Sequence, residues 1–174
     1  KLRHTIVFLD YRMNKKLLKN LINLYKPNYI FLNNINSNFD KNYRLILSFK
    51  SYILLHRKDE FQHKLSDDLM LMMSTSGTTG SSKFVKQSFS NIKDNTEKII
   101  KYLKIKKKDI TITSLPISYV YGLSVINTHL LSGASIVLTN SSMVEKKFWD
   151  LIDEHKVTNF SGVPYNYLLI ERII

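Results

Sequence analysis

The amino-acid sequence predicts an α/β fold, with a largely parallel β-sheet flanked by helices. Short apolar runs rich in β-branched and aromatic residues alternate with longer segments whose apolar residues recur at helical spacing. Strands that alternate with helices are typical of βαβ units, in which the strands are parallel. A length of 174 residues is enough to bury one ordinary core, and it favours one domain over two.

The first part of the chain begins with a strand and a helix. The run TIVFL at 5–9 favours a strand, and residues 14–25 space leucines and isoleucine at helical intervals behind Asn14, a capping residue type. Pro27 is expected to end this helix, because proline lacks the backbone N–H that a helix needs. Further strands are expected within 26–34, at 43–49 and at 52–57, with a polar loop at 35–42.

The second part of the chain alternates more regularly. Ser90 is expected to cap a helix, Pro116 to close a strand and Gly133 to end a helix. The expected strands are 68–75, 83–88, 109–116, 135–140 and 157–164, and the expected helices are 90–104, 119–134, 144–156 and 165–173.

The chain is strongly basic, with a formal net charge of +12. Such a surplus suits phosphate-bearing partners such as nucleotides, nucleic acid or acidic lipid. The alternative is a generically solvated basic surface, because the lysines occur among many asparagines and isoleucines, a bias that AT-rich coding produces. The run KIKKKD at 104–109 has the same two interpretations: a solvated turn between a helix and a strand, or a phosphate-binding patch.

Several classes of site are disfavoured by composition. The absence of cysteine excludes disulfides, thiolate metal sites and cysteine nucleophiles. No apolar run is long enough for a membrane span or a signal peptide, so a cytoplasmic protein is expected. His129 and His155 have no carboxylate or second histidine at ligand spacing, so they are expected to be structural and no metal site is predicted. Phe148 and Trp149 are expected on the buried face of a helix.

The stretch TSGTTGSSK at 75–83 follows an apolar strand and carries the chemistry of a phosphate site. Its glycines let the backbone approach a ligand, its hydroxyls suit phosphate oxygens, and its lysine adds a mobile positive charge. It is not the P-loop of kinases and GTPases, which needs lysine directly after the second glycine. The alternative is an ordinary Ser/Thr/Gly surface loop. The candidate phosphate-binding residues are Thr75, Ser76, Gly77, Thr78, Thr79, Gly80 and Lys83.

The same stretch resembles the signature of the adenylate-forming enzymes, the superfamily of acyl-CoA synthetases, carrier-protein adenylation domains and luciferases. Asp68 before the strand and Asn91 beyond the loop match the same pattern. Two later blocks agree in order and spacing: LPISYVYGLSVINTHLLSGASIVL at 115–138 and HKVTNFSGVPYNYLLI at 155–170. The resemblance covers residues 67–172, and residues 7–31 match more loosely.

The resemblance implies that ATP and a carboxylate react to give an acyl-adenylate and pyrophosphate, with Mg²⁺ as cofactor and a thiol of coenzyme A or of a carrier protein's phosphopantetheine as acyl acceptor. It implies that the 75–83 stretch holds the β- and γ-phosphates. Ser82 and Phe84 depart from the family's proline and glycine, so Phe84 is expected to pack as a strand residue. The implied residues of the acyl pocket are Tyr119, Gly162, Val163 and Pro164. The alternative for Tyr119 is an aromatic side chain packed at the start of a helix. The alternative for Val163 and Pro164 is packing in the core.

The resemblance further implies that residues 1–174 are part of the N-terminal domain of an AMP-forming ligase of the acyl-CoA ligase type. The family's C-terminal domain is absent from the sequence, as are its glutamate and ribose-binding blocks, so the chain alone is expected to be inactive and to self-associate. Three alternatives stay open: a carrier-protein adenylation domain for amino or aryl acids, a degenerate non-catalytic fold, and a basic nucleic-acid-binding module.

Overall fold

The computed structural model describes residues 4–10, 12–33, 41–59, 61–74 and 84–172. The chain divides into two compact units, one formed by Lys1–Tyr11 with Asp67–Ile174 and the other by Arg12–Ser66. Each unit has its own buried apolar cluster. The length of the chain predicts one core, and the structure corrects this to two.

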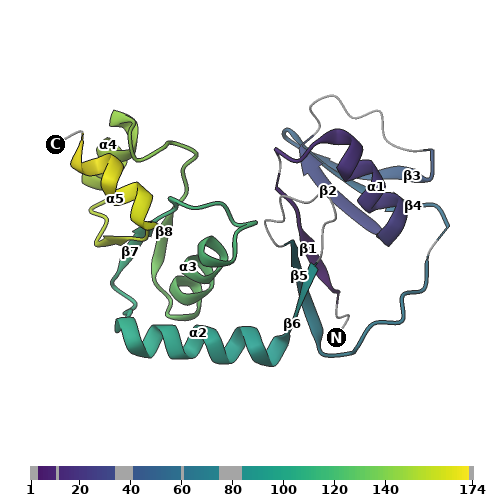
Figure 1. The fold of residues 1–174 in the computed structure, drawn as a ribbon, viewed down its shortest axis with the longest axis horizontal. Coiled ribbons are helices and arrows are strands. Elements are labelled where there is room, and N and C mark those ends of the chain that lie inside the picture. Colours follow the sequence, from purple (N-terminus) through teal and green to yellow (C-terminus); the bar gives the residue numbers. More distant parts are fainter. Residues whose placement is uncertain (1–3, 11, 34–40, 60, 75–83, 173–174) are drawn as a thin grey trace. The chain divides into compact units, whose positions relative to one another are not determined.

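The smaller unit is an antiparallel sheet with one helix. It consists of α1 (Lys15–Tyr25), β2 (Tyr29–Asn33), β3 (Tyr43–Phe49) and β4 (Tyr52–Arg57), with strand order β2-β4-β3 (Figure 1). The expectation of parallel strands is wrong here, because β3 and β4 are joined by a two-residue turn, which only an antiparallel pair allows.

Helix α1 packs on one face of this sheet. The side chain of Asn14 caps it by accepting a hydrogen bond from the backbone N of Lys16 at 2.8 Å, as the sequence predicts. The helix contributes Ile22 to a cluster whose buried members are Tyr43, Ile53 and Leu55. The other face of the sheet stays open and carries a stacked cross-strand pair, Phe31 and Tyr52.

The larger unit begins with a mixed sheet of β1 (Ile6–Phe8), β5 (Leu69–Ser74) and β6 (Phe84–Ser88). Strand β1 is parallel to β5, while β6 returns antiparallel to β5. Helix α2 (Phe89–Leu103) follows β6 directly and is capped by Ser88 rather than by Ser90. The correction has a geometric cause: Ser88 has extended backbone angles and its Oγ accepts from the backbone N of Asn91 at 3.0 Å, whereas Ser90 already lies inside the helix.

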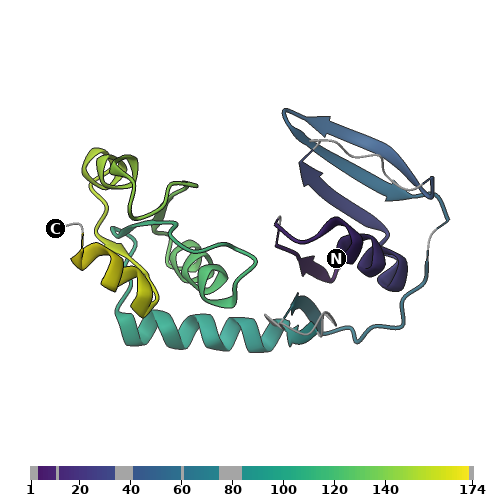
Figure 2. The ribbon, with the colours of Figure 1, turned by 45° about the horizontal axis from the view of Figure 1, so that its top comes forward.

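The rest of this unit is a parallel α/β layer. Strands β7 (Ile110–Ile112), β8 (Ser135–Val137) and β9 (Asn159–Phe160) form a sheet in the order β8-β7-β9. Helix α3 (Val120–Leu131) lies on one side of this sheet, and α4 (Lys146–Glu154) and α5 (Pro164–Glu171) lie on the other (Figures 1 and 2). Helix α3 ends where the sequence predicts, because Gly133 adopts a φ of 67°, which suits glycine.

The predicted α/β alternation is therefore present, but the strands are distributed over three sheets among the described residues rather than one. Three strand pairs are parallel and three antiparallel. The sequence pattern missed the β3–β4 hairpin because its turn, Lys50–Ser51, lacks the glycine that usually signals one. Of the helices that the structure describes, none has the length and hydropathy to cross a membrane.

Candidate functional site

The predicted phosphate-binding stretch lies between two paired strands. Ser74 at the end of β5 and Phe84 at the start of β6 are register partners, so both ends of the 75–83 segment are anchored on one hairpin. Phe84 is a strand residue, as predicted. Because β5 is parallel to β1, the segment follows the carboxyl end of a parallel strand, the edge where α/β sheets bind ligands. Residues 75–83, which include every predicted phosphate ligand, lie outside the described residues, so their role stays a prediction.

The open end of the same hairpin is held by a polar network. The carboxylate of Asp68 accepts a hydrogen bond from Ser90 Oγ at 3.3 Å, and the backbone O of Asp68 accepts one from the N of Phe89 at 3.0 Å. Ser88 Oγ donates to Asn91 Oδ1 at 2.8 Å. Asp68, which matches the family pattern before the loop, thus ties the start of β5 to the first turn of α2, while Asn91, which matches it beyond the loop, bonds to the capping residue Ser88. Spacing alone did not reveal these roles.

The loops that carry the predicted pocket residues leave the carboxyl edge of the β8-β7-β9 sheet, where two hydroxyl side chains join them. Thr113, just past β7, donates its backbone N–H to Val137 O at 2.9 Å, and its Oγ1 accepts from the backbone N of Thr139 at 2.9 Å. On the other side, Ser114 Oγ donates to Ser161 O. These two hydroxyl side chains join the loop after β7 to the loops after β8 and β9. Sequence reasoning did not single them out, although adjacent Ser and Thr at a strand end are a usable signal.

Tyr119 lies in the loop after β7 and is the N-cap residue of α3. Its backbone N donates to Pro116 O at 3.0 Å, and its side chain is 49% exposed. The loop crosses closely over α3, because a Cβ on Gly122 would lie 2.3 Å from Pro116 O and 2.8 Å from Leu115 O. The crevice beneath the loop is too narrow for a water molecule. Tyr119 is thus exposed on a tightly fixed loop, and its role as a pocket gate stays a prediction.

Gly162 and Val163 lie in the loop after β9, beside the loop that carries Tyr119. The backbone N of Val163 donates to Asn166 Oδ1 at 2.9 Å, and Pro164 is the first residue of α5, where its missing N–H costs nothing. A Cβ on Gly162 would meet Tyr167 Cε2 at 3.3 Å, which makes the position tight. The hydrogen bond between Ser114 and Ser161 brings the two predicted pocket loops to one edge of the sheet.

The other candidate residues have structural surroundings. Phe148 is fully buried, and Trp149 Nε1 donates to Met143 O at 2.8 Å, so both lie on the packed face of α4, as predicted. His129 is buried, with Nδ1 2.8 Å from Val125 O, and this contact requires the Nδ1–H form because a carbonyl only accepts. No group of three or more His, Cys, Asp or Glu side chains that could hold a metal is found among the described residues.

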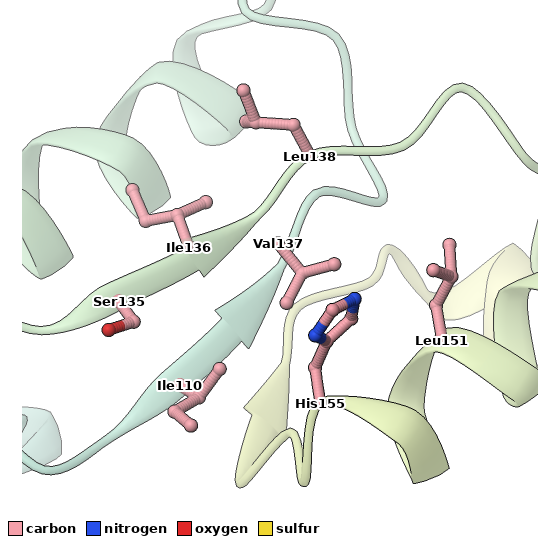
Figure 3. A pocket seen from close by; sticks show the side chains of 7 residues that line it. All are labelled: Ile110, Ser135, Ile136, Val137, Leu138, Leu151 and His155. Carbon is pink, nitrogen blue, oxygen red and sulfur yellow. The ribbon is translucent and has the colours of Figure 1, made fainter.

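An open hollow of about 490 Å³ lies over β8, away from the predicted pocket loops (Figure 3). Val137 points toward His155, the C-cap residue of α4, and Leu151 lies on that helix. On the outer surface of α4, a hydrogen bond from Lys146 to Asp150 raises the pKa of the Lys146 ammonium above its ordinary 10.5. Neither feature lies on the loops that carry the candidate site.

Comparison with known proteins places this arrangement in context. The family model described as AMP-binding enzyme matches residues 3–170. A 2-succinylbenzoate–CoA ligase of Bacillus velezensis is 33% identical over 97 residues, which are 56% of this chain and 20% of that protein. The acyl-CoA synthetase ALT10 of Alternaria alternata is 36% identical over 107 residues, 60% of this chain and 18% of that protein.

Solved structures agree with the sequence comparison. The o-succinylbenzoate CoA synthetase of Bacillus subtilis, in complex with ATP and a magnesium ion, matches with a TM-score of 0.55 and 25% identity over 74% of this chain and 24% of that chain. The same enzyme in complex with its acyl-adenylate intermediate matches with a TM-score of 0.69 and 19% identity over 98% of this chain and 45% of that chain, which shows a shared fold.

The chain spans about a fifth of the length of the curated relatives it matches. The structural matches confirm the predicted α/β class, since these neighbours are ligases that share this fold. The family match extends over nearly every described residue and includes both edges that carry the candidate site. The chain belongs to the family of AMP-binding enzymes.

Proposed function

We propose that the protein carrying this chain is an ATP-dependent, AMP-forming acyl-CoA ligase. In the first step a carboxylate oxygen of the substrate attacks the α-phosphorus of ATP, the bond from that phosphorus to the bridging oxygen breaks, and pyrophosphate leaves. In the second step the thiolate of coenzyme A attacks the acyl carbon and AMP leaves with the electron pair of the broken bond. Names of similar proteins support this proposal, because they are CoA ligases and acyl-CoA synthetases.

The 75–83 segment is proposed to hold the phosphates that leave. A carboxylate needs no protein base to attack, so the protein contributes positioning and donors that absorb charge on the leaving group. Thr75, Ser76, Thr78 and Thr79 would offer hydroxyls, and Lys83 would offer a positive charge. The observation that carries the proposal is the register pair of Ser74 and Phe84, the two residues that flank this segment at the carboxyl edge of β1 and β5 within the family match.

The acyl group is proposed to lie against the loops after β7 and β9. Tyr119 and the segment Gly162–Pro164 come from these two loops, which the hydrogen bond from Ser114 to Ser161 joins. A half-exposed aromatic ring on one loop and a tightly packed glycine on the other suit an apolar acyl chain. Magnesium would neutralise the phosphates of bound ATP; the described residues supply no cluster of ligands for it, so none is assigned here.

Pyrophosphate exchange in the protein carrying this chain tests the phosphate role. Lys83→Ala is expected to lower ATP–pyrophosphate exchange about a hundredfold, because it removes one phosphate partner. Lys86→Ala is the matched control, since Lys86 carries the same charge three residues later, is exposed and lies on β6. Equal exchange by the two folded variants would disprove the assigned role of Lys83.

The acyl acceptor is tested with the same protein. Incubation with ATP, Mg²⁺ and a panel of aliphatic, aryl and amino acids, followed by coenzyme A or a carrier protein bearing phosphopantetheine, is expected to give acyl-CoA from an aliphatic or aryl acid. Acyl transfer only to the carrier protein would assign the adenylation-domain alternative. Absence of AMP formation with every acid would favour the degenerate fold.

A further inference from the structure

The C-terminal end of α2 and the turn that follows carry the densest positive charge of the chain. Residues 98–108 contain six lysines and no acidic residue. All six lysine side chains are exposed. We call this surface the basic patch; its lysines are Lys98, Lys101, Lys104, Lys106, Lys107 and Lys108.

The turn within the patch has a fixed shape. The carboxylate of Asp109 accepts a hydrogen bond from the backbone N of Lys106 at 2.7 Å, and the N of Asp109 donates back to Lys106 O at 2.9 Å. The acidic side chain that directly follows the patch is therefore used to close the turn. The Cγ of Lys107 lies 3.6 Å from the Cβ position of Gly133, which brings the end of α3 beside the patch.

Apolar side chains are exposed among these lysines. Tyr102 is 85% exposed and Leu103 is 59% exposed at the end of α2. Leu130 and Leu131 at the end of α3 are 63% and 58% exposed. Large apolar side chains exposed to water are not expected of a turn that is merely solvated. Lysines that only complemented the dipole of α2 would not continue past the end of the helix at Leu103.

We propose that the basic patch docks on the surface of an anionic lipid bilayer. Lysines near a bilayer are attracted to acidic headgroups, while tyrosine and leucine gain by burial at the boundary between headgroups and acyl chains. Nucleic acid would use the lysines but not the leucines, because its interfaces are polar and its bases stack on aromatic rings. This docking would leave the loops after β7 and β9 free, since they lie at the opposite edge of the parallel sheet.

Vesicle sedimentation with the 174-residue chain tests the proposal. Vesicles of equal parts phosphatidylglycerol and phosphatidylcholine are expected to bind the chain, and pure phosphatidylcholine vesicles are not. The triple variant Lys106→Gln, Lys107→Gln, Lys108→Gln is expected to bind about a hundredfold more weakly. The matched control is Lys15→Gln, Lys16→Gln, Lys19→Gln, which removes the same charge from exposed positions of α1. Circular dichroism checks the fold of both variants.

Tyr102→Ser separates insertion from simple charge attraction. It leaves the charge unchanged and is expected to weaken vesicle binding about tenfold while leaving the unfolding midpoint unchanged, because the side chain is 85% exposed. Equal loss of binding in both triple variants would overturn the proposal in favour of net charge. Absence of vesicle binding, with patch-dependent binding of duplex DNA instead, would also overturn it.

Discussion

The parallel β8-β7-β9 sheet and the antiparallel β2-β4-β3 sheet differ in how they bury their apolar side chains. In the parallel sheet, Thr111 and Ile112 of the central strand are fully buried, and helices cover both sides. In the antiparallel sheet, α1 covers one face, and Phe31 and Phe49 are 67% and 65% exposed on the other. Crossover helices bury both faces of a parallel sheet as a consequence of its connections, whereas an antiparallel sheet can keep one face open.

The difference indicates which sheet can hold functional side chains in fixed positions. The candidate pocket loops leave a sheet that is fixed from both sides, and Thr113 and Ser114 add hydrogen bonds across its edge. The open face of the antiparallel sheet is apolar rather than polar, which is the composition of a surface that is normally covered. Four experiments, in order of expected effect, break or sharpen this comparison.

Replacing one phenylalanine at each sheet by alanine is expected to give the largest difference in the free energy of unfolding. Phe148→Ala is expected to lower the free energy of unfolding by about 4 kcal/mol, because it leaves a cavity under the parallel sheet. Phe31→Ala is expected to cost less than about 1 kcal/mol, since its ring only stacks on Tyr52 at the surface. Urea unfolding followed by circular dichroism measures both. Similar costs would mean that Phe31 is covered in solution.

Gly122→Ala tests the fixed loop on the parallel sheet. The added Cβ would meet the backbone O of Pro116, which cannot move aside without shifting the loop, so a loss of about 3 kcal/mol is expected. Ser124→Ala, at a partly buried position of the same helix, is the control and should change little. A Gly122→Ala protein as stable as the parent would show that this loop adapts, and the argument from close packing would fail.

Lysines in left-handed backbone conformation give a smaller, opposite effect. Lys104 follows α2 with φ 54°, and Lys50 forms the β3–β4 turn with φ 52°. Replacing either by glycine is expected to raise the free energy of unfolding by about 1 kcal/mol, because glycine adopts this region without strain. Lys101→Gly, inside the last turn of α2, should instead cost about 1 kcal/mol. Loss of stability in all three variants would contradict the conformational argument.

The open face is expected to affect association more than stability. The double variant Phe31→Ser, Phe49→Ser should leave the unfolding midpoint nearly unchanged but shift the sedimentation of the chain toward the monomer, because both rings are largely exposed. Unchanged self-association would show that the chains associate through a surface other than this face.

Local signals in the sequence predicted most elements but not all of their pairing. The helix start predicted from Asn14 and the helix end predicted from Gly133 are confirmed, because capping and left-handed turns depend on single residues. The separation of β1 and β2 into different sheets depends on long-range contacts that periodicity does not encode. At the candidate site, motif order identified Tyr119 and Gly162, while the roles of Ser114 and Thr113 required knowledge of which strands are neighbours.

Helix α2 also acts as a spacer between the two halves of the candidate site. It begins at the Asp68–Ser90 hydrogen bond, at the hairpin whose strands flank the proposed phosphate-binding segment, and contacts α3, which follows the loop of Tyr119. A helix of 15 residues is about 22 Å long, so a tilt of about 5° moves its far end by about 2 Å. Thr96 is buried midway and its Oγ1 donates to Ile92 O at 2.7 Å, a bond that bends helices slightly. Thr96 is thus a buried residue at the middle of the helix that connects the hairpin beside the proposed phosphate segment to the unit's parallel sheet.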